Sequence, residues 1–464
     1  MILSKNQINR YIRHIIMPEI SGQGQKKLLE SSVSIYGENV KEIMPLTLYL
    51  AAMGLGKIQC NIHDSQGYDL LFTQATDLND DVKIELIHDN LVESNFRIVL
   101  GNSEFIKKTA GLFSGKDFTP TIYSVINHWK FAIVPMNSGE LHSFVELFNQ
   151  STTECSITFI SALAGTICSI EAVKQILNIG NTLKDILLFD LFNLEINTYE
   201  KAEVQSSIDR LLKIENINYK SVTEKIGDAK ILIVGAGGLG SPSSLAMVMS
   251  GVGEIGLVDS DSVELSNLNR QVLHSSSRIG MPKAESAKLM LQSINPQVKI
   301  NTYIENLTKE NAQRIIEEYD LVISAVDNIQ TRYLINDLCY FMKKTVIEAG
   351  VLRFDGTNTT IIPDEGHCYR CLYPNLNTSG MSCAETGVLG AVPGVMGFIQ
   401  AAEAYKVLAE IGTNLKNKIL LFDGLEMEFN IISLYKNPDC PLCGKHPTIK
   451  TLQNYDIKCG NEEL

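Results

Sequence analysis

The sequence lacks the long apolar runs and the basic balance that bring a protein to a membrane or to nucleic acid. No apolar segment follows Met1, so we expect no secretory signal peptide. The two most apolar stretches, residues 157–170 and 388–402, are shorter than a membrane span and contain glycine, proline or serine, which favours buried helices. The net charge of -13 argues against nucleic acid or an anionic membrane as the main partner. These absences predict a cytoplasmic protein that binds neither membrane nor nucleic acid.

A context for disulfides is also absent, although the chain has ten cysteines. Such thiols are expected to stay reduced or to bind metal. Four of them form two Cys-x-x-Cys pairs, Cys368 with Cys371 and Cys440 with Cys443, and Gly444 lets the second pair turn. Four thiolates suit tetrahedral zinc with no open position, so we predict a structural Zn²⁺ that clips the C-terminal segment to the sheet. A redox role for either pair is the alternative.

An internal repeat indicates how the 464 residues are divided. Residues 164–190 and 393–423 each read as an apolar helix, a glycine stop and a strand that ends in Phe-Asp. Upstream segments correspond too: Val33–Gly37 with Leu232–Gly235, Gly54–Gly56 with Gly251–Gly253, and Arg10–Arg13 with Arg210–Lys213. We therefore predict a first domain over residues 1–205, a second over 206–445 and a tail over 446–464.

The first copy has lost the residues that carry chemistry in the second. Gly37 is followed by Glu38-Asn39-Val40-Lys41, so the close backbone approach that a glycine turn permits is gone. No Cys-x-x-Cys pair occurs there. The first half is thus expected to be a pseudo-domain that has kept its fold while its site has decayed.

The second half alternates strands and amphipathic helices. Strands are expected near residues 230–234, 254–258, 321–326 and 345–349, and the helix after Pro282 should stop at Asn295-Pro296. This alternation predicts a mostly parallel sheet with helices on both faces. The predicted fold class is α/β, with two Rossmann-like doubly wound domains, the second bearing the zinc site.

A glycine turn follows the first of these strands. Its glycines let backbone N–H groups and a helix N-terminus approach a phosphate, and Asp259, 19 residues after Gly240, is spaced to meet ribose hydroxyls. The predicted nucleotide-binding glycines are Gly235, Gly237, Gly238 and Gly240. At this point NAD and ATP are both open.

Fixed cations beside the turn favour ATP. Arg270 and Lys283 would stabilise the charge that develops on a polyphosphate during cleavage, and Asn267 adds a neutral donor. Asp327, followed by Asn328 at the carboxyl end of a strand, is placed to hold Mg²⁺. The set favours nucleotidyl transfer over hydride transfer, which would use neither cation.

Cys383 lies in a small, polar stretch between the first cysteine pair and an apolar helix. That context suits a nucleophilic thiolate, although exposure alone does not make one. Covalent participation and an inert thiol are both open, and most of the other cysteines outside the two pairs are expected in the core.

Together these residues resemble the HesA/MoeB/ThiF family of adenylating enzymes, relatives of the ubiquitin-activating enzymes. The resemblance covers residues 206–445, and the first half resembles the family only in outline. The matched segments are Gly235–Gly240, Asp259–Asp261, Ser266–Gln271, Gly280–Lys283, Asn295-Pro296, Asp327-Asn328 with Arg332, Cys368–Leu372, Ser382–Val388 and Cys440–Cys443.

The resemblance implies an adenylyltransferase that uses Mg-ATP and releases pyrophosphate. Its implied substrate is the C-terminal glycine carboxylate of a small ubiquitin-like sulfur carrier of the MoaD/ThiS type, activated for sulfur transfer in cofactor biosynthesis. By family roles, Asp259 binds the ribose, Gly238 makes a backbone contact and Asp327 serves the metal. The same roles give the phosphates to Asn267, Arg270 and Lys283. No rhodanese-like domain follows residue 445, so a sulfur donor would be a separate protein.

The resemblance also suggests a use for the first half. Cys383 matches a cysteine that takes an acyl group or persulfide in some relatives only. In symmetric relatives an N-terminal arginine reaches across the dimer into the partner's ATP site. We hypothesise that Arg13 completes the second half's site within one chain, which makes the chain a pseudo-dimer; Lys213 stands at the corresponding position of the second copy. Further pairing into a homodimer stays open, as does a role for Arg13 as a mere helix cap.

Other interpretations remain at this stage. The adenylated substrate could be a ribosomal precursor peptide in natural-product maturation, with the first half as a peptide clamp. An NAD-dependent oxidoreductase is a different class that leaves Arg270, Lys283 and the cysteine pairs without a use. A non-enzymatic scaffold suits the first half alone.

Overall fold

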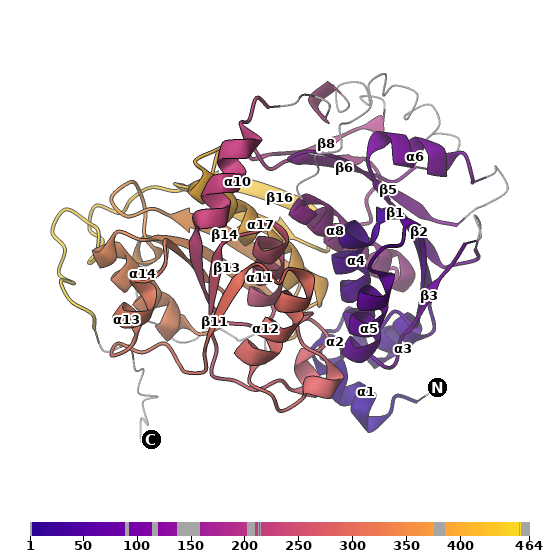
Figure 1. The fold of residues 1–464 in the computed structure, drawn as a ribbon, viewed down its shortest axis with the longest axis horizontal. Helices are drawn as coiled ribbons and strands as arrows, with labels where there is room; N and C mark the ends of the chain where they lie inside the picture. Colours follow the sequence, from indigo (N-terminus) through magenta and orange to yellow (C-terminus); the bar gives the residue numbers. More distant parts are fainter. Residues whose placement is uncertain are drawn as a thin grey trace.

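The computed structural model describes residues 2–88, 92–113, 119–136, 158–201, 209–211, 213, 215–374, 386–453 and 455. Within these residues it contains two eight-stranded sheets with the same strand order (Figure 1). The first runs β3-β2-β1-β4-β5-β6-β7-β8 and the second β11-β10-β9-β12-β13-β14-β15-β16. The predicted boundary near residue 205 lies outside the described residues.

The first half consists of β1 (Ser32–Asn39), β2 (Lys57–Asp64), β3 (Lys83–Leu86), β4 (Phe96–Gly101), β5 (Thr121–Asn127), β6 (Lys130–Val134), β7 (Ile186–Asp190) and β8 (Glu195–Tyr199), with helices α1 (Lys5–Arg10), α2 (Ile12–Ile15), α3 (Ser21–Leu29), α4 (Val40–Met53), α5 (Tyr68–Leu78), α6 (Ser103–Ala110) and α8 (Thr158–Leu177). The inner helices α4 and α8 pack against one face of its sheet and α6 against the other.

The second half consists of β9 (Lys230–Val234), β10 (Glu254–Val258), β11 (Lys299–Tyr303), β12 (Leu321–Ser324), β13 (Thr345–Leu352), β14 (Asp355–Ile361), β15 (Lys418–Asp423) and β16 (Glu428–Ser433). Its α-helices are α10 (Tyr219–Asp228), α11 (Gly240–Met249), α12 (Lys283–Ile294), α13 (Ala312–Ile316), α14 (Ile329–Met342), α15 (Tyr369–Leu372) and α17 (Ala391–Ala409), with 3₁₀ turns η2 (Leu265–Asn267) and η3 (Ser276–Arg278). The helix predicted after Pro282 begins and ends as expected.

Each sheet is mixed rather than fully doubly wound. In the first, β3, β2, β1, β4 and β5 are parallel, and β6, β7 and β8 extend the sheet antiparallel. The second sheet repeats this pattern. The α/β class is therefore confirmed. The predicted parallel arrangement is correct only for the strands that precede β6 in the first half and β14 in the second.

One apolar core joins the two halves. Helices α4 and α8 of the first half pack against α11 and α17 of the second, between the two sheets (Figure 1). Helix α8 is long and apolar enough by length and composition to cross a membrane, but 89% of its apolar window is buried inside the fold. It is longer than the stretch 157–170 suggests because it continues to Leu177, and its burial agrees with a core helix.

The halves also exchange reciprocal backbone hydrogen bonds. The residue after the glycine stop of each copy donates to a carbonyl of the other half. Asn181 N–H donates to Leu425 O (2.9 Å), and Thr413 N–H donates to Phe192 O (2.7 Å). Each half therefore uses the same surface to contact the other, as in a two-fold symmetric interface.

Candidate functional site

The glycine turn between β9 and α11 needs glycine for backbone reasons. Gly235 has a φ of 100°, in the left-handed region, and a Cβ there would lie 2.5 Å from Ala325 O. A Cβ on Gly240 would lie 1.8 Å from Gly235 O. The turn thus exposes its backbone at the carboxyl ends of β9 and β12, where ligands bind in open α/β sheets.

Asp259 lies directly after β10 and is tied to this turn. Its carboxylate accepts hydrogen bonds from Ala236 N–H (2.7 Å) and Asp261 N–H (2.9 Å). Burial raises the pKa of the Asp259 carboxyl, and the nearby Lys283 ammonium offsets part of that rise. The predicted ribose-binding acid is therefore fixed beside the predicted phosphate-binding turn.

Lys283 opens α12 on the same side. Its side chain is 9% exposed, and its ammonium lies 2.8 Å from Asp261 Oδ2. Arg270 lies against the turn as well, because a Cβ on Gly238 would be 3.7 Å from Arg270 Cδ. The guanidinium donates to Ser266 O (3.0 Å) and Asn269 Oδ1 (2.9 Å). Both predicted cations are thus gathered at the site.

Three buried side-chain amide atoms in the segment 267–271 lack hydrogen-bond partners among the described residues. They are Asn267 Oδ1, Asn269 Nδ2 and Gln271 Oε1. A buried polar atom without a partner is costly, so such atoms point to a ligand or ordered water. This observation fits a polar ligand at the turn, such as a nucleotide.

Asp327 and Asn328 follow β12 at the same edge of the sheet, and both are exposed. Asn328 Oδ1 accepts Thr331 N–H (2.9 Å) and caps α14. Arg332 donates to Val326 O (2.7 Å) and pairs with the buried Glu348. The Asp327 carboxylate is therefore free of the capping role and open to a metal, while Asn328 has a structural task.

The segment that contains Arg13 crosses from the first half to the rim of this site. Arg13 O accepts Val388 N–H (3.2 Å), and Gly390 N–H donates to His14 Nε2 (3.0 Å). A Cβ on Gly390 would lie 2.1 Å from Asn269 O, so this contact adjoins the Arg270 segment. The backbone of Arg13, whose side chain is half-buried, is thereby held against the segment before α17, next to the Arg270 segment.

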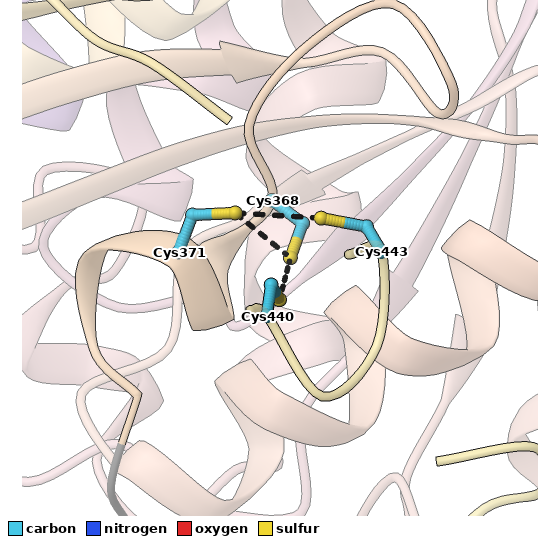
Figure 2. A group of neighbouring side chains, drawn as sticks. All are labelled: Cys368, Cys371, Cys440 and Cys443. Carbon is cyan, nitrogen blue, oxygen red and sulfur yellow. Dashed lines mark hydrogen bonds between the residues drawn. The ribbon is translucent and has the colours of Figure 1, made fainter. Parts of the chain in front are cut away.

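The four paired cysteines converge, as Figure 2 shows. The Sγ–Sγ distances are 3.9 Å for Cys368–Cys371, 3.6 Å for Cys368–Cys440 and 3.3 Å for Cys371–Cys443. A tetrahedron with Zn–S bonds of about 2.3 Å separates its sulfurs by about 3.8 Å, so the thiols fit Zn²⁺. A Cβ on Gly444 would lie 2.5 Å from Cys440 O, which explains the glycine in the second knuckle.

The residues around the cysteines hold the C-terminal segment on α14. Arg370 pairs with the buried Asp337 through two hydrogen bonds of 2.8 Å, and Tyr455 O–H donates to Asp337 Oδ2 (2.7 Å). Part of the predicted tail over 446–464 is thus packed against the second half.

Known proteins resemble the second half, which carries this site. The family model described as ThiF family matches residues 208–442. The chain belongs to the ThiF family. A sulfur carrier protein adenylyltransferase of Thermus thermophilus is 44% identical over 244 residues, which are 51% of this chain and 90% of that protein. A SAMP-activating enzyme E1 of Haloferax volcanii is 42% identical over 219 residues, 47% of this chain and 81% of that protein.

A third relative of this ThiF-family chain is longer. The adenylyltransferase and sulfurtransferase MOCS3 of Culex quinquefasciatus is 38% identical over 293 residues, and the match spans 62% of this chain but only 65% of that protein. Family membership and the enzyme class, adenylyltransferase, are confirmed by these relatives.

One residue of the ThiF-family site was not anticipated from the sequence. His274 is fully buried; its Nε2 lies 2.9 Å from Ala236 O and its Nδ1 lies 3.0 Å from Ser286 Oγ. Since a carbonyl only accepts, Nε2–H donates to Ala236 O and Nδ1 accepts from the Ser286 hydroxyl. Burial lowers the pKa of His274 to about 3, so the ring is neutral. It ties the glycine turn to α12, and no spacing rule predicts that tie.

Cys383, the predicted nucleophile, lies outside the described residues. Of the other cysteines, Cys60, Cys168 and Cys339 are buried, as expected for core thiols. Burial raises the pKa of the Cys60 thiol to about 12, which keeps it protonated and inert.

Proposed function

We propose that this chain adenylates the C-terminal glycine carboxylate of a small ubiquitin-like sulfur carrier protein at the expense of ATP. The observation that carries the proposal is the gathering of Asp259, Arg270 and Lys283 around one glycine turn, beside buried amide atoms that lack protein partners. The names of the relatives at 42% and 44% identity support the choice of a carrier protein as substrate.

The proposed reaction joins the carrier to AMP. One carboxylate oxygen attacks the α-phosphorus, the bond from that phosphorus to the bridging oxygen breaks, and pyrophosphate leaves with the electron pair. The resulting acyl-adenylate has AMP as a good leaving group, whereas a carboxylate offers only oxide. The carrier is thereby prepared for attack by a sulfur nucleophile.

Each residue of the site has a defined task in this proposal. Asp259 binds ribose hydroxyls, the backbone of the glycine turn cradles phosphate, and Asn267 donates to it. Arg270 and Lys283 offset the charge that builds on the departing pyrophosphate. Bound Mg²⁺ would neutralise phosphate charge, and Asp327 would hold it.

Zinc is proposed as a structural ion held by the four cysteines, with no open position for chemistry. Thiolates persist where thiols stay reduced, and we place the protein in the cytoplasm for that reason. A separate protein is the proposed sulfur donor.

We further propose that the first half is a degenerate copy of the ThiF domain. The shared strand order supports this origin. At the position of the glycine turn, Asn39 caps α4 directly, and the Glu38 carboxylate accepts from Asn102 (2.8 and 3.0 Å). A carboxylate in that place repels polyphosphate, so we expect one ATP site per chain.

Pyrophosphate exchange tests the proposed function. Labelled pyrophosphate should enter ATP only with a carrier that has a free C-terminal glycine, and a carrier that lacks this glycine should give background exchange. Lys283→Ala should reduce exchange by roughly 100-fold, whereas Lys288→Ala on the same helix should leave it within about twofold. Mg-ATP binding without any AMP-capped carrier would refute the proposal.

A further inference from the structure

The first half grips the second half close to the nucleotide turn. Asp77 of α5 accepts two hydrogen bonds from Ser277, one from the backbone N–H (3.0 Å) and one from the hydroxyl (2.6 Å). Arg10, which is buried, donates to Ser276 Oγ (3.0 Å) and to Leu78 O (2.7 Å). The η3 turn is therefore held from the opposite half of the chain.

A continuous set of contacts leads from this grip to the glycine turn. Arg278, which ends η3, donates to the backbone oxygen of Ser286 in α12. The Ser286 hydroxyl donates to His274, and His274 donates to Ala236 O. The N–H of Ala236 in turn binds the Asp259 carboxylate (2.7 Å). The position of η3 therefore affects the positions of both the glycine turn and Asp259.

We propose that Asp77 is a positioning residue of the nucleotide site, which acts from the first half through η3 and His274. The inference rests on the proposed function, because it assumes that the glycine turn binds ATP. Ser277 is exposed, and its backbone N–H donates directly to the Asp77 carboxylate, whereas Arg10 binds η3 only through the Ser276 side chain. If η3 shifts, His274 moves with it and displaces Ala236. The glycine turn then no longer presents its backbone in the geometry that phosphate requires.

The first half would then have a structural role in ATP binding, although it has lost its own catalytic residues. Its fold is retained because α5 and Arg10 hold η3 in the place that ATP binding needs. Helix α5 contacts η3 directly, so this contact does not require the decayed site of the first half.

ATP affinity, measured by calorimetry on the full chain without carrier, tests the inference. Asp77→Ala removes both hydrogen bonds and should weaken ATP binding by about three- to tenfold. Asp77→Asn should restore the wild-type affinity, because an amide oxygen accepts from the Ser277 N–H and the amide NH₂ donates to the hydroxyl. Asp69→Ala, the same charge change on an exposed position of α5, serves as the control and should change nothing.

Kinetics separate positioning from mere stabilisation. In pyrophosphate exchange, Asp77→Ala should raise the KM for ATP and leave kcat within about twofold. Ser277→Ala removes one of the same bonds and provides a second test should Asp77→Ala not fold. Its loss should be smaller than that of Asp77→Ala, and the double variant should lose less than the sum of the two.

The outcomes are distinct. If Asp77→Ala and Ser277→Ala bind ATP as tightly as the wild type, the inference alone is overturned. A loss of affinity in Asp77→Ala that Asp77→Asn does not restore would also overturn it. A wild-type chain that binds no ATP would overturn the proposed function and this inference together. A lower melting temperature with unchanged ATP affinity would assign Asp77 to docking of the halves only, against the proposal.

Discussion

At the scale of single residues, two buried histidines join segments that lie far apart in the sequence. His274 links the glycine turn to α12, and His14 links the first half to the segment before α17. Because Gly390 N–H donates to His14 Nε2, the other ring nitrogen donates to Gln25 Oε1 (2.9 Å). Burial lowers the pKa of His14 to about 4, so both rings are neutral in the folded chain.

These rings predict a loss of stability in mild acid. Unfolded histidines take up a proton below their ordinary pKa of 6.5, while the folded rings do not until about pH 4 and 3. A lowered histidine pKa therefore contributes stability that is present above pH 6.5 and is lost as the pH falls. Each ring should cost ~1.4 kcal/mol per pH unit over that range, measurable as the free energy of unfolding in urea at pH 7 and pH 5.

The matched variants identify the source of that slope. His14→Gln should fold less stably at pH 7 but lose less stability between pH 7 and pH 5 than the wild type. His446→Gln, which changes an exposed ring, should keep the wild-type slope. An unchanged slope in His14→Gln would contradict the assignment of a neutral buried ring.

The sequence predicts residues whose role follows from backbone geometry better than residues that act through burial. Gly235 and Gly240 are predictable because no other side chain fits their conformation or spacing. Asp259 is predictable from its distance along the chain to the turn. His274 is not, because a neutral histidine in a core has no spacing that sets it apart from any other buried residue.

At the scale of elements, the sequence predicts the parallel strands β9, β10, β12 and β13 but not the parallel edge strand β11. In the antiparallel extension it predicts β15, the strand that ends in Phe-Asp, but not β14 or β16. Strands β9, β10 and β12 each contain an unbroken apolar segment (231–234, 255–258 and 321–323), and β13 is apolar apart from Thr345 and Glu348. The turn from β13 to β14 holds Arg353 at a φ of 55° instead of the glycine or asparagine that signals a hairpin. β16 alternates half-buried and exposed residues, a weaker signal than an apolar run. The sequence therefore predicts the strands that carry the site, while β14 and β16 at the antiparallel edge are missed.

The cysteine group predicts a metal-dependent element. Cys440→Ser should abolish the binding of about one zinc ion per chain and lower the melting temperature by several degrees. Metal analysis and calorimetry measure both, and limited proteolysis should begin within residues 434–453, which the group holds against α14. Cys60→Ala removes a buried thiol outside the group and should retain the metal. A metal-free wild type with the same melting temperature would contradict a structural zinc.

At the scale of the whole molecule, the leading segments of the two halves cross over. In one direction, the Glu19 carboxylate pairs with Arg353 of the second half. In the other, Glu215 pairs with Lys130 of the first half (3.0 Å), and the Tyr219 ring stacks on His128. Because the halves also share one core, separating them would expose apolar surface on both, so neither is expected to act alone.

The crossover makes Arg13 the one proposed catalytic residue that comes from the first half. Its backbone adjoins the Arg270 segment, while Lys213 O, at the corresponding position of the other copy, accepts from Lys130 in a half without a glycine turn. Arg13→Ala should therefore reduce pyrophosphate exchange by roughly 100-fold, the cost of one lost charge-stabilising group, with an unchanged melting temperature. Lys213→Ala should leave exchange at the wild-type rate. Near-normal exchange in Arg13→Ala would leave the first half with a positioning role and no catalytic group.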